Sequence, residues 1–345
     1  MSFADWEQAS KTLENFGFIQ KSEDKITVEE RYVKEIIEPD ILERRIAFEL
    51  TTYDKDVRTY AKVMHQVSSY KLAKEIFNKQ VTNNVQPNVY TFNTLINKAI
   101  DYAEGRKILV KMETYSVKPN VFTFNILINK TPSYKQGKLM LSEMKSASVK
   151  PDVFTFNILM NRIANYGHGK VMLSEMEFAR VDPNVVTFNT WMNRVTYYEQ
   201  GKEVLSEMKS VSVKPDVFTF NILMNRANDY NEGKKILKSM KVANIKPNEV
   251  TFTTLMNKAR DYEEGMQILD SMRMENVKPD VFTFTTLMNK ASRSEDILFI
   301  LEEMKINDVF FDEVMLHQLM NLSRTDKRIQ EVYDALMEEQ HKDLY

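Results

Sequence analysis

The sequence predicts an all-α protein, an α-solenoid of stacked helix–turn–helix repeats, and three observations lead to this fold class. Seven of the nine prolines recur at steps of 32 residues, from Pro87 to Pro279. Six of the eight glycines recur at the same step, from Gly105 to Gly265. Each step also contains two stretches with apolar residues at helical spacing. Because proline and glycine punctuate backbone structure, their shared period indicates a repeat array rather than separate globular domains.

Each repeat is predicted to hold two amphipathic helices. In the unit of residues 153–184, Phe156 and Leu159 occupy positions 4 and 7, on one face of a first helix. Met172 and Met176, at positions 20 and 24, belong to the apolar face of a second helix, which ends before the closing proline. Hairpins this short cannot bury a core alone, so we expect neighbouring repeats to stack.

The periodic glycine at position 17 lies inside the second helix, where it costs about 1 kcal/mol relative to alanine. Close approach of the paired helix would explain this cost. We expect the glycine to lie under the tyrosine at position 14 of its own repeat. The tyrosines at this position are Tyr102, Tyr134, Tyr166, Tyr198, Tyr230 and Tyr262.

The repeat pattern divides the chain into three parts. Residues 1–56 lack the repeat and predict an N-terminal helical cap of two or three helices. Residues 57–312 form eight units of 32 residues, and residues 313–345 predict a C-terminal helical cap, because repeat arrays need polar ends. The first unit, 57–88, is degenerate. The clear units are 89–120, 121–152, 153–184, 185–216, 217–248, 249–280 and 281–312.

The composition excludes several classes of protein. With no cysteine and four scattered histidines, the chain offers no disulfide framework and no metal centre, and we expect no cofactor. No apolar run approaches the roughly 18 residues of a membrane span. The acidic N-terminus differs from a signal or transit peptide, so we expect a cytoplasmic location, with a mitochondrial or other organellar one left open. A net charge of −2 means that a nucleic-acid site would need a local positive stripe.

The units resemble the pentatricopeptide repeat. The shared motifs are the opening V-x-T-F-N-x-L, as in residues 121–127, the Glu-Met pair of the second helix, and the closing V-K-P-D or V-K-P-N. The resemblance covers about three quarters of the chain. It implies a right-handed superhelix that binds single-stranded RNA, one nucleotide per repeat, with the N-terminal repeat toward the 5′ end. These units are shorter than the family's usual unit near the end of the first helix, which affects the expected spacing between bases.

The resemblance implies that the fifth and the last residue of each unit together read one base. The fifth residues are Asn93, Asn125, Asn157, Asn189, Asn221, Thr253 and Thr285, and the last residues are Asn120, Asp152, Asn184, Asp216, Asn248, Asp280 and Asp312. Ionised Asp only accepts hydrogen bonds and suits the ring N–H of uracil or guanine, whereas Asn can also donate to the ring nitrogen of cytosine. In the family, threonine at position 5 admits guanine. The implied target is therefore 5′-YUYUYGG-3′, where Y is a pyrimidine, with cytosine preferred over uracil. Capping of the next helix is a second role open to the last residue.

Three further rows favour a nucleic-acid face. Position 2 points away from the core and, in the family, stacks on bases, although packing between repeats is an alternative. Position 10 is basic in every clear unit and predicts a phosphate-binding stripe. The position-2 residues are Tyr90, Phe122, Phe154, Val186, Phe218, Val250 and Phe282, and the position-10 residues are Lys98, Lys130, Arg162, Arg194, Arg226, Lys258 and Lys290. Position 9, always asparagine from Asn97 to Asn289, is expected to line the same groove.

The sequence therefore predicts sequence-specific binding of single-stranded RNA without catalysis. Such binding would serve post-transcriptional regulation, stabilisation or processing of RNA, with a ribosome or nuclease machinery as a possible further partner and no membrane or metal. The alternative is a scaffold that holds a peptide in its concave face, but a peptide groove has no need for the alternation of Asn and Asp. A third hypothesis, RNA cleavage, rests only on Arg58 and His65, whose spacing is best explained by chance.

Overall fold

The structure, a computed structural model, describes residues 19–22, 25–28, 56–324, 327–331 and 333–334. The chain divides into two compact units, residues 1–151 and residues 152–345, and each is described by itself. Much of the two predicted caps lies outside the described residues.

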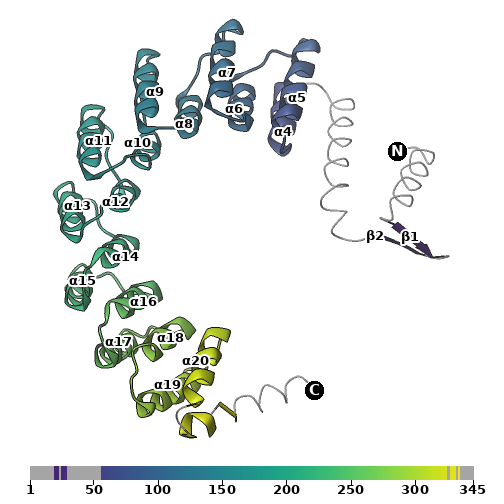
Figure 1. Cartoon of the computed structure of the whole chain (residues 1–345). Helices are drawn as coiled ribbons and strands as arrows, with labels where there is room; N and C mark the ends of the chain where they lie inside the picture. The colour runs from purple at the N-terminus through teal and green to yellow at the C-terminus, as the bar shows by residue number, and fades with distance from the viewer. Residues whose placement is uncertain (1–18, 23–24, 29–55, 325–326, 332, 335–345) are drawn as a thin grey trace. The chain divides into compact units, whose positions relative to one another are not determined.

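The described part of the first unit contains three helix pairs and a short hairpin. The pairs are α4 (Val57–Gln66) with α5 (Tyr70–Thr82), α6 (Val89–Lys98) with α7 (Tyr102–Thr114), and α8 (Val121–Lys130) with α9 (Tyr134–Ser146). The first helices α4, α6 and α8 pack side by side in chain order, as Figure 1 shows. Helices α5 and α7 each also contact the first helix of the next pair. The pairs therefore stack rather than fold as independent hairpins.

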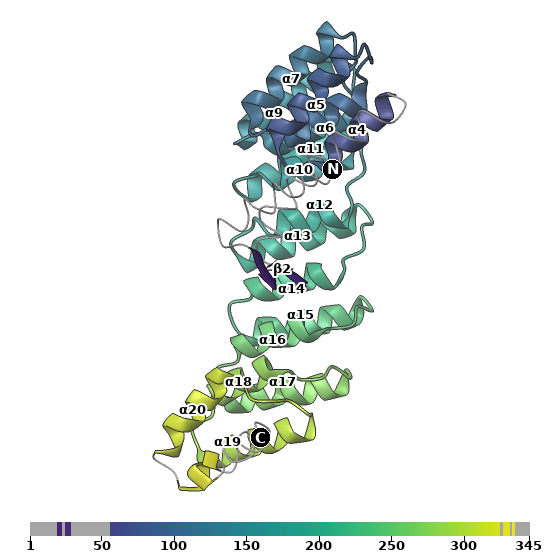
Figure 2. The same ribbon diagram turned by 90° about the vertical axis from the view of Figure 1, so that its right-hand side faces the viewer.

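The second unit continues the same arrangement. Its pairs are α10 (Val153–Met160) with α11 (Tyr166–Phe178), α12 (Val185–Met192) with α13 (Tyr198–Ser210), α14 (Val217–Arg226) with α15 (Tyr230–Val242), α16 (Glu249–Lys258) with α17 (Tyr262–Met274), and α18 (Val281–Met288) with α19 (Ser294–Ile306). Helix α20 (Glu313–Ser323) follows, and residues 327–331 and 333–334 are also helical. Figure 2 shows α12 to α17 as successive layers in chain order. The predicted helix–turn–helix repeat is confirmed in both units.

A capping box opens the first helix of every clear repeat. The side chain of the residue before the helix accepts a hydrogen bond from the backbone N–H of the threonine at position 3, and this threonine's hydroxyl accepts one from the capping residue's backbone N–H. The capping residues are Asn88, Asn120, Asp152, Asn184, Asp216, Asn248 and Asp280. The last residue of a repeat therefore does cap the helix that follows it.

The core lies between the first and second helices of stacked pairs. Phenylalanine at position 4 is at most 2% exposed in every clear repeat, and methionine at position 24 is fully buried. A row of large side chains at fixed helical spacing therefore supplies each repeat with the same apolar contact to its neighbours. Among the described residues, no helix is both long enough and apolar enough to span a membrane.

Residues 19–22 and 25–28 correct the expectation of helix in the N-terminal cap. Strand β1 (Ile19–Ser22) pairs antiparallel with β2 (Lys25–Val28), with Ile19 opposite Val28. The run Ile26, Thr27 and Val28 consists of β-branched residues, which favour strands over helices. The remainder of the predicted cap, up to residue 55, lies outside the described residues.

The periodic glycine has a different partner from the expected tyrosine. A Cβ atom on Gly169 would lie 2.0 Å from Nε1 of Trp191, which is position 7 of the next repeat. A Cβ on Gly233 would lie 2.2 Å from Cδ1 of Leu255, also at position 7 of the next repeat. The glycine therefore makes room for the first helix of the following repeat, and the prediction that it lies under its own tyrosine was wrong.

Candidate nucleic-acid interface

The structure places position 5 of a repeat in contact with the last residue of that repeat. Asn189 Nδ2 lies 3.1 Å from Asp216 Oδ1 and donates a hydrogen bond to it. The same hydrogen bond, at 3.1–3.4 Å, joins Asn93 with Asn120, Asn157 with Asn184, and Asn221 with Asn248. The two side chains that the sequence assigns to one base therefore lie side by side in these four repeats. Asn125 lies in the first compact unit, residues 1–151, and Asp152 in the second, residues 152–345.

Capping leaves one polar atom of the last residue unused. Asp216 Oδ1 accepts from the backbone N–H of Thr219, at 2.8 Å, as well as from Asn189. Among the described residues, no hydrogen bond uses the second carboxylate oxygen of Asp216 or the Nδ2 group of Asn120, Asn184 or Asn248. The repeat that ends in Asp216 thus keeps an acceptor available, and the repeats that end in Asn120, Asn184 and Asn248 keep a donor.

Threonine at position 5 does not reach the last residue. The Thr253 hydroxyl lies 2.9 Å from the backbone oxygen of Glu249, and the Thr285 hydroxyl lies 2.8 Å from that of Val281. Both hydroxyls therefore bond to the preceding turn of their own helix, a common alternative for this side chain. Asp280 and Asp312 still cap the next helix in these two repeats.

Position 2 forms an exposed row on the first helices. The exposed fraction of these side chains runs from 51% at Val186 to 72% at Tyr90, although four of the seven are phenylalanine. Packing between repeats, the alternative role, would have buried them. Because positions 2 and 5 are three residues apart on one helix, the exposed side chain and the amide lie on neighbouring parts of the same face.

Five position-10 cations donate a hydrogen bond to a backbone carbonyl at the end of the first helix of the preceding repeat. Lys130 Nζ donates to the backbone oxygen of Ala99 at 2.7 Å, and Lys258 Nζ donates to that of Asn225 at 3.1 Å. The equivalent contacts join Lys290 with Ala259, Arg226 with Asn193, and Arg194 with Asn161. Each cation thus satisfies a carbonyl at a helix C-terminus, where positive charge is favoured. Burial lowers the pKa of the Lys130 ammonium.

This contact was missed from the sequence, although a signal existed. A basic residue at the end of a helix is typical of C-terminal capping. Position 10 is the last residue of α6, α8, α14 and α16 and lies two residues after the end of α10, α12 and α18. The position of the basic residues was predicted from the sequence. Their carbonyl partner was not predicted, because it lies in the neighbouring repeat. The position-9 asparagines are exposed at the same helix ends. Lys98 and Arg162 occupy the same position and are partly buried.

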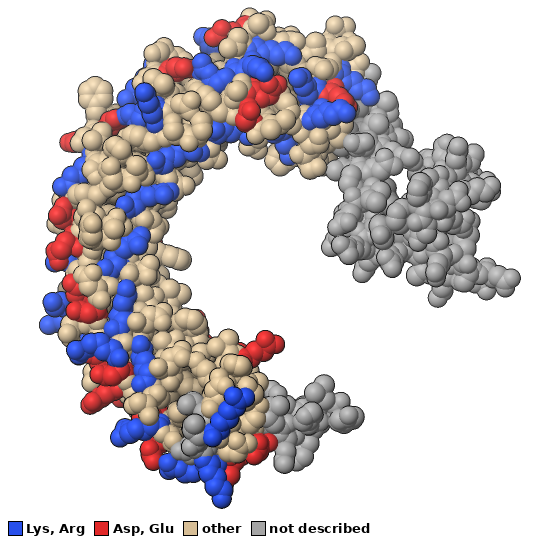
Figure 3. Space-filling view, in the orientation of Figure 1, with Lys and Arg blue, Asp and Glu red and all other residues tan. Residues whose placement is uncertain are grey.

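Charge is unevenly distributed over the second unit. In Figure 3, a line of Lys and Arg side chains follows the region of α12, α14 and α16, while Asp and Glu gather over α13 and α15. The first helices carry the position-2, position-5 and position-10 rows. The positive charge therefore lies near the exposed apolar row, despite the slightly negative net charge of −2.

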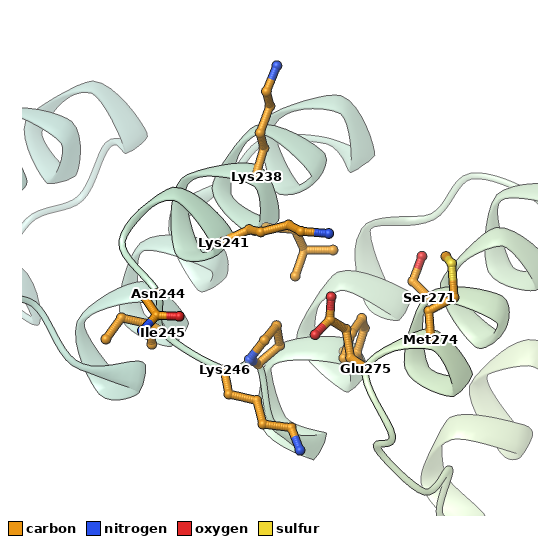
Figure 4. Close-up of a pocket in the computed structure, with 11 residues that line it drawn as sticks. Lys238, Lys241, Asn244, Ile245, Lys246, Ser271, Met274 and Glu275 are labelled. Atoms are coloured by element: carbon orange, nitrogen blue, oxygen red, sulfur yellow. The ribbon is translucent and has the colours of Figure 1, made fainter.

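A groove on the second helices does not include the predicted site. It has a volume of about 750 Å³ and lies between α15, the turn that follows it, and α17. Figure 4 shows Lys241 and Glu275 on opposite sides of this groove. None of the residues predicted to read bases, stack on them or bind phosphate lines it.

The part of the chain that the structure describes contains no group of three or more His, Asp or Glu side chains that could hold a metal ion. Arg58 and His65 lie exposed on α4.

Comparisons with known proteins identify the family. The model of the pentatricopeptide repeat domain matches residues 52–101, 75–131, 139–197 and 235–292, which together make up more than half of the chain, and the PPR repeat family model matches residues 183–227. No curated protein matches the chain in sequence.

Solved structures show the same fold. The pentatricopeptide repeat protein PPR10 from maize is 20% identical with a TM-score of 0.65, over 87% of this chain and 48% of that one. PPR10 in complex with an 18-nt psaJ RNA element is 21% identical with a TM-score of 0.50, over 90% of this chain and 48% of that one. The chain thus spans about half the length of these structures. The all-helical fold of stacked helix pairs is confirmed, and the chain belongs to the pentatricopeptide repeat family.

Proposed function

We propose that this protein binds single-stranded RNA of sequence 5′-YUYUYGG-3′, one nucleotide per clear repeat. The N-terminal repeat lies toward the 5′ end. The observation that carries this proposal is the unused polar atom of the last residue beside four position-5 asparagines, Asn93, Asn157, Asn189 and Asn221. It is an acceptor in the repeat that ends in Asp216 and a donor in the repeats that end in Asn120, Asn184 and Asn248.

The two kinds of atom match two pyrimidines. Uracil presents an N–H at ring position 3, which needs an acceptor, whereas cytosine presents a bare nitrogen there, which needs a donor. A second oxygen of Asp216 suits the first base, and the Nδ2 group of Asn184 suits the second. The hydrogen bond from position 5 holds the last residue in place beside the base, so one repeat contributes one pair of side chains.

The exposed position-2 row supports binding of unpaired bases. Stacking on aromatic or apolar side chains is a main source of affinity for single strands, and it is available only when bases are not paired in a duplex. Position-2 side chains of adjacent repeats would sandwich each base. Their exposure of at least 51% leaves this surface accessible.

The consequence of binding would be protection or control of an RNA rather than its chemical change. A bound chain of this size would block a nuclease, a ribosome or the formation of RNA structure over the element. We place this activity in post-transcriptional regulation, stabilisation or processing, in the cytoplasm or an organelle.

A binding assay with three RNAs tests the proposal. The protein should bind a single strand that contains CUCUCGG, and it should ignore the same element in a duplex, because the base edges there are already paired. The reversed order GGCUCUC has the same composition and should bind at least about tenfold more weakly, since several contacts are mismatched at once. Equal binding of both single strands would contradict sequence reading. Binding of neither single-stranded RNA nor DNA at low salt would leave the peptide scaffold as the better explanation.

A further inference from the structure

The threonine at position 3 touches the base-reading asparagine of the preceding repeat. The Thr219 hydroxyl lies 2.6 Å from Asn189 Oδ1. The same 2.6 Å contact joins Thr123 with Asn93, Thr187 with Asn157, and Thr251 with Asn221. These threonines are completely buried. In these four cases, a repeat sends one hydroxyl back to the position-5 amide of the repeat before it.

The Thr219 hydroxyl and the Asp216 carboxylate together determine which way the Asn189 amide faces. It has one proton, and Asn189 Oδ1 is its nearest acceptor, since Asp216 Oδ1 lies farther away at 2.9 Å. The amide oxygen therefore points toward Thr219, and the NH₂ group points toward Asp216. A flipped amide would place its oxygen against the carboxylate oxygen of Asp216, and two acceptors would then face each other.

We propose that the position-3 threonine of the following repeat is a positioning residue for base recognition. By holding the oxygen of the position-5 asparagine, it leaves only N–H groups of that amide available to a nucleotide and to the last residue. The base preference of a repeat then depends on a side chain in the next repeat. The inference rests on the proposed RNA binding, but the orientation of the amide can be measured without RNA.

The chain contains its own control. Thr283 is also buried and also completes a capping box, but position 5 of the preceding repeat is Thr253, which bonds to its own helix. The Thr283 hydroxyl lies 2.7 Å from Asp280 Oδ1 and holds no amide. Replacing Thr219 or Thr283 by valine removes the same capping hydroxyl, but only the first replacement releases an asparagine.

The experiment compares three variants on RNAs that differ at one nucleotide. Thr219→Val should reduce the preference for uracil at the fourth nucleotide about fivefold, the effect of one hydrogen bond, with the other nucleotides unaffected. Thr219→Ser retains the hydroxyl and should keep the preference, which also guards against a folding defect in the valine variant. Thr283→Val should keep the preference at the sixth nucleotide. In the free protein, the Asn189 side-chain amide should give one pair of NMR signals that shifts or doubles only in Thr219→Val.

Two results would overturn the inference. One is an unchanged fourth-nucleotide preference in Thr219→Val together with unchanged Asn189 amide signals. The other is an equal loss of preference in Thr219→Val and Thr283→Val, which would assign the effect to the lost capping box. If the unmodified protein binds no RNA, the proposed function fails, and the amide signals alone decide whether the threonine holds the asparagine.

Discussion

The last residue of a repeat caps the next helix with a side-chain oxygen. Capping requires a single acceptor, and Asn and Asp serve equally well as N-caps. Stability of the next helix therefore gives no reason for the change from Asn184 to Asp216 between adjacent repeats. The atom that capping leaves unused does differ, because it is a donor in one case and an acceptor in the other. We infer that selection between the two residues acts on that atom.

The sequence could predict part of this site. The repeat period and the family resemblance were sufficient to pair Asn189 with Asp216, which the structure places in contact at 3.1 Å. The contact from Thr219 could not be predicted, because a threonine three residues after a capping Asp already has a local explanation as a capping-box residue. Its second partner lies 30 positions earlier and comes close only when repeats stack.

The ionisation of a single residue, Glu264, makes the stability of the folded protein depend on pH. Arg260 donates to this buried carboxylate through its side chain, at 2.6 and 3.0 Å, and through its backbone N–H, and these bonds hold the pKa of Glu264 below its usual value. A lowered pKa in the folded state means that this stabilisation is present above the unfolded pKa of about 4.3 and is lost as pH falls through the folded value.

Glu264→Gln should therefore lower the Tm at pH 7, and the difference from the unmodified protein should shrink as pH falls through the lowered pKa of the folded state, below which the native carboxyl is also neutral. Thermal unfolding followed by circular dichroism measures both effects. Glu263→Gln changes the exposed neighbour in the same turn and should leave the Tm nearly unchanged. A Tm difference for Glu264→Gln that stays constant from pH 7 to pH 3 would show that ionisation of this group is irrelevant.

At the scale of the helix, the periodic glycine sets how closely repeats stack. Gly169 in α11 faces Trp191 in α12, and Gly265 in α17 faces Leu287 in α18. The expected close approach was correct, but the sequence of one hairpin cannot show which neighbour comes close. Helical spacing identifies the two faces of a helix, whereas the partner depends on how consecutive pairs pack. The tyrosine at position 14 was therefore a reasonable but wrong choice.

Two glycines of the same helix provide a matched test. Gly169→Ala would bring Cβ within 2.0 Å of the Trp191 ring and should destabilise the protein by about 2–3 kcal/mol, the upper range for overpacking. Gly167→Ala meets only Asn165 Oδ1 at 3.5 Å and should stabilise by about 0.5 kcal/mol, since alanine favours helix. Chemical unfolding of both variants measures the difference. Similar stability of the two variants would refute the packing role.

At the scale of the whole molecule, the row of position-10 cations can serve two roles, hydrogen bonding to backbone carbonyls and binding of phosphates. Lys130 and Lys258 already donate to carbonyls of the preceding repeat, yet an ammonium has three donors and can also meet a phosphate. The row therefore connects consecutive first helices along each unit and places positive charge beside the exposed position-2 side chains. Its period could be predicted from the sequence, but its carbonyl partners required the stacked structure.

Salt dependence of RNA affinity tests the phosphate role of this row. If all seven position-10 cations meet phosphates, the log–log slope of affinity against salt should be about −5, from roughly −0.7 per contact. Arg194→Gln should reduce the slope by less than one unit and weaken all sequences similarly. Lys238→Gln, on the second helix α15, should leave it unchanged. If Arg194→Gln lowers the RNA affinity but leaves the slope unaltered, Arg194 does not contact a phosphate and acts only through its structural contact with Asn161.

The central claim is that each repeat reads one nucleotide through its last residue, and selection from a randomised RNA pool with Asp216→Asn tests it most directly. Asn still caps α14, but it replaces the unused acceptor by a donor. The unmodified protein should select uracil at the fourth nucleotide. The variant should select cytosine there, with a change of about 1–3 kcal/mol by analogy with a mismatched base in DNA recognition, and the other six nucleotides should stay the same. Retention of uracil at the fourth nucleotide, or a loss of preference at all seven, would contradict the account.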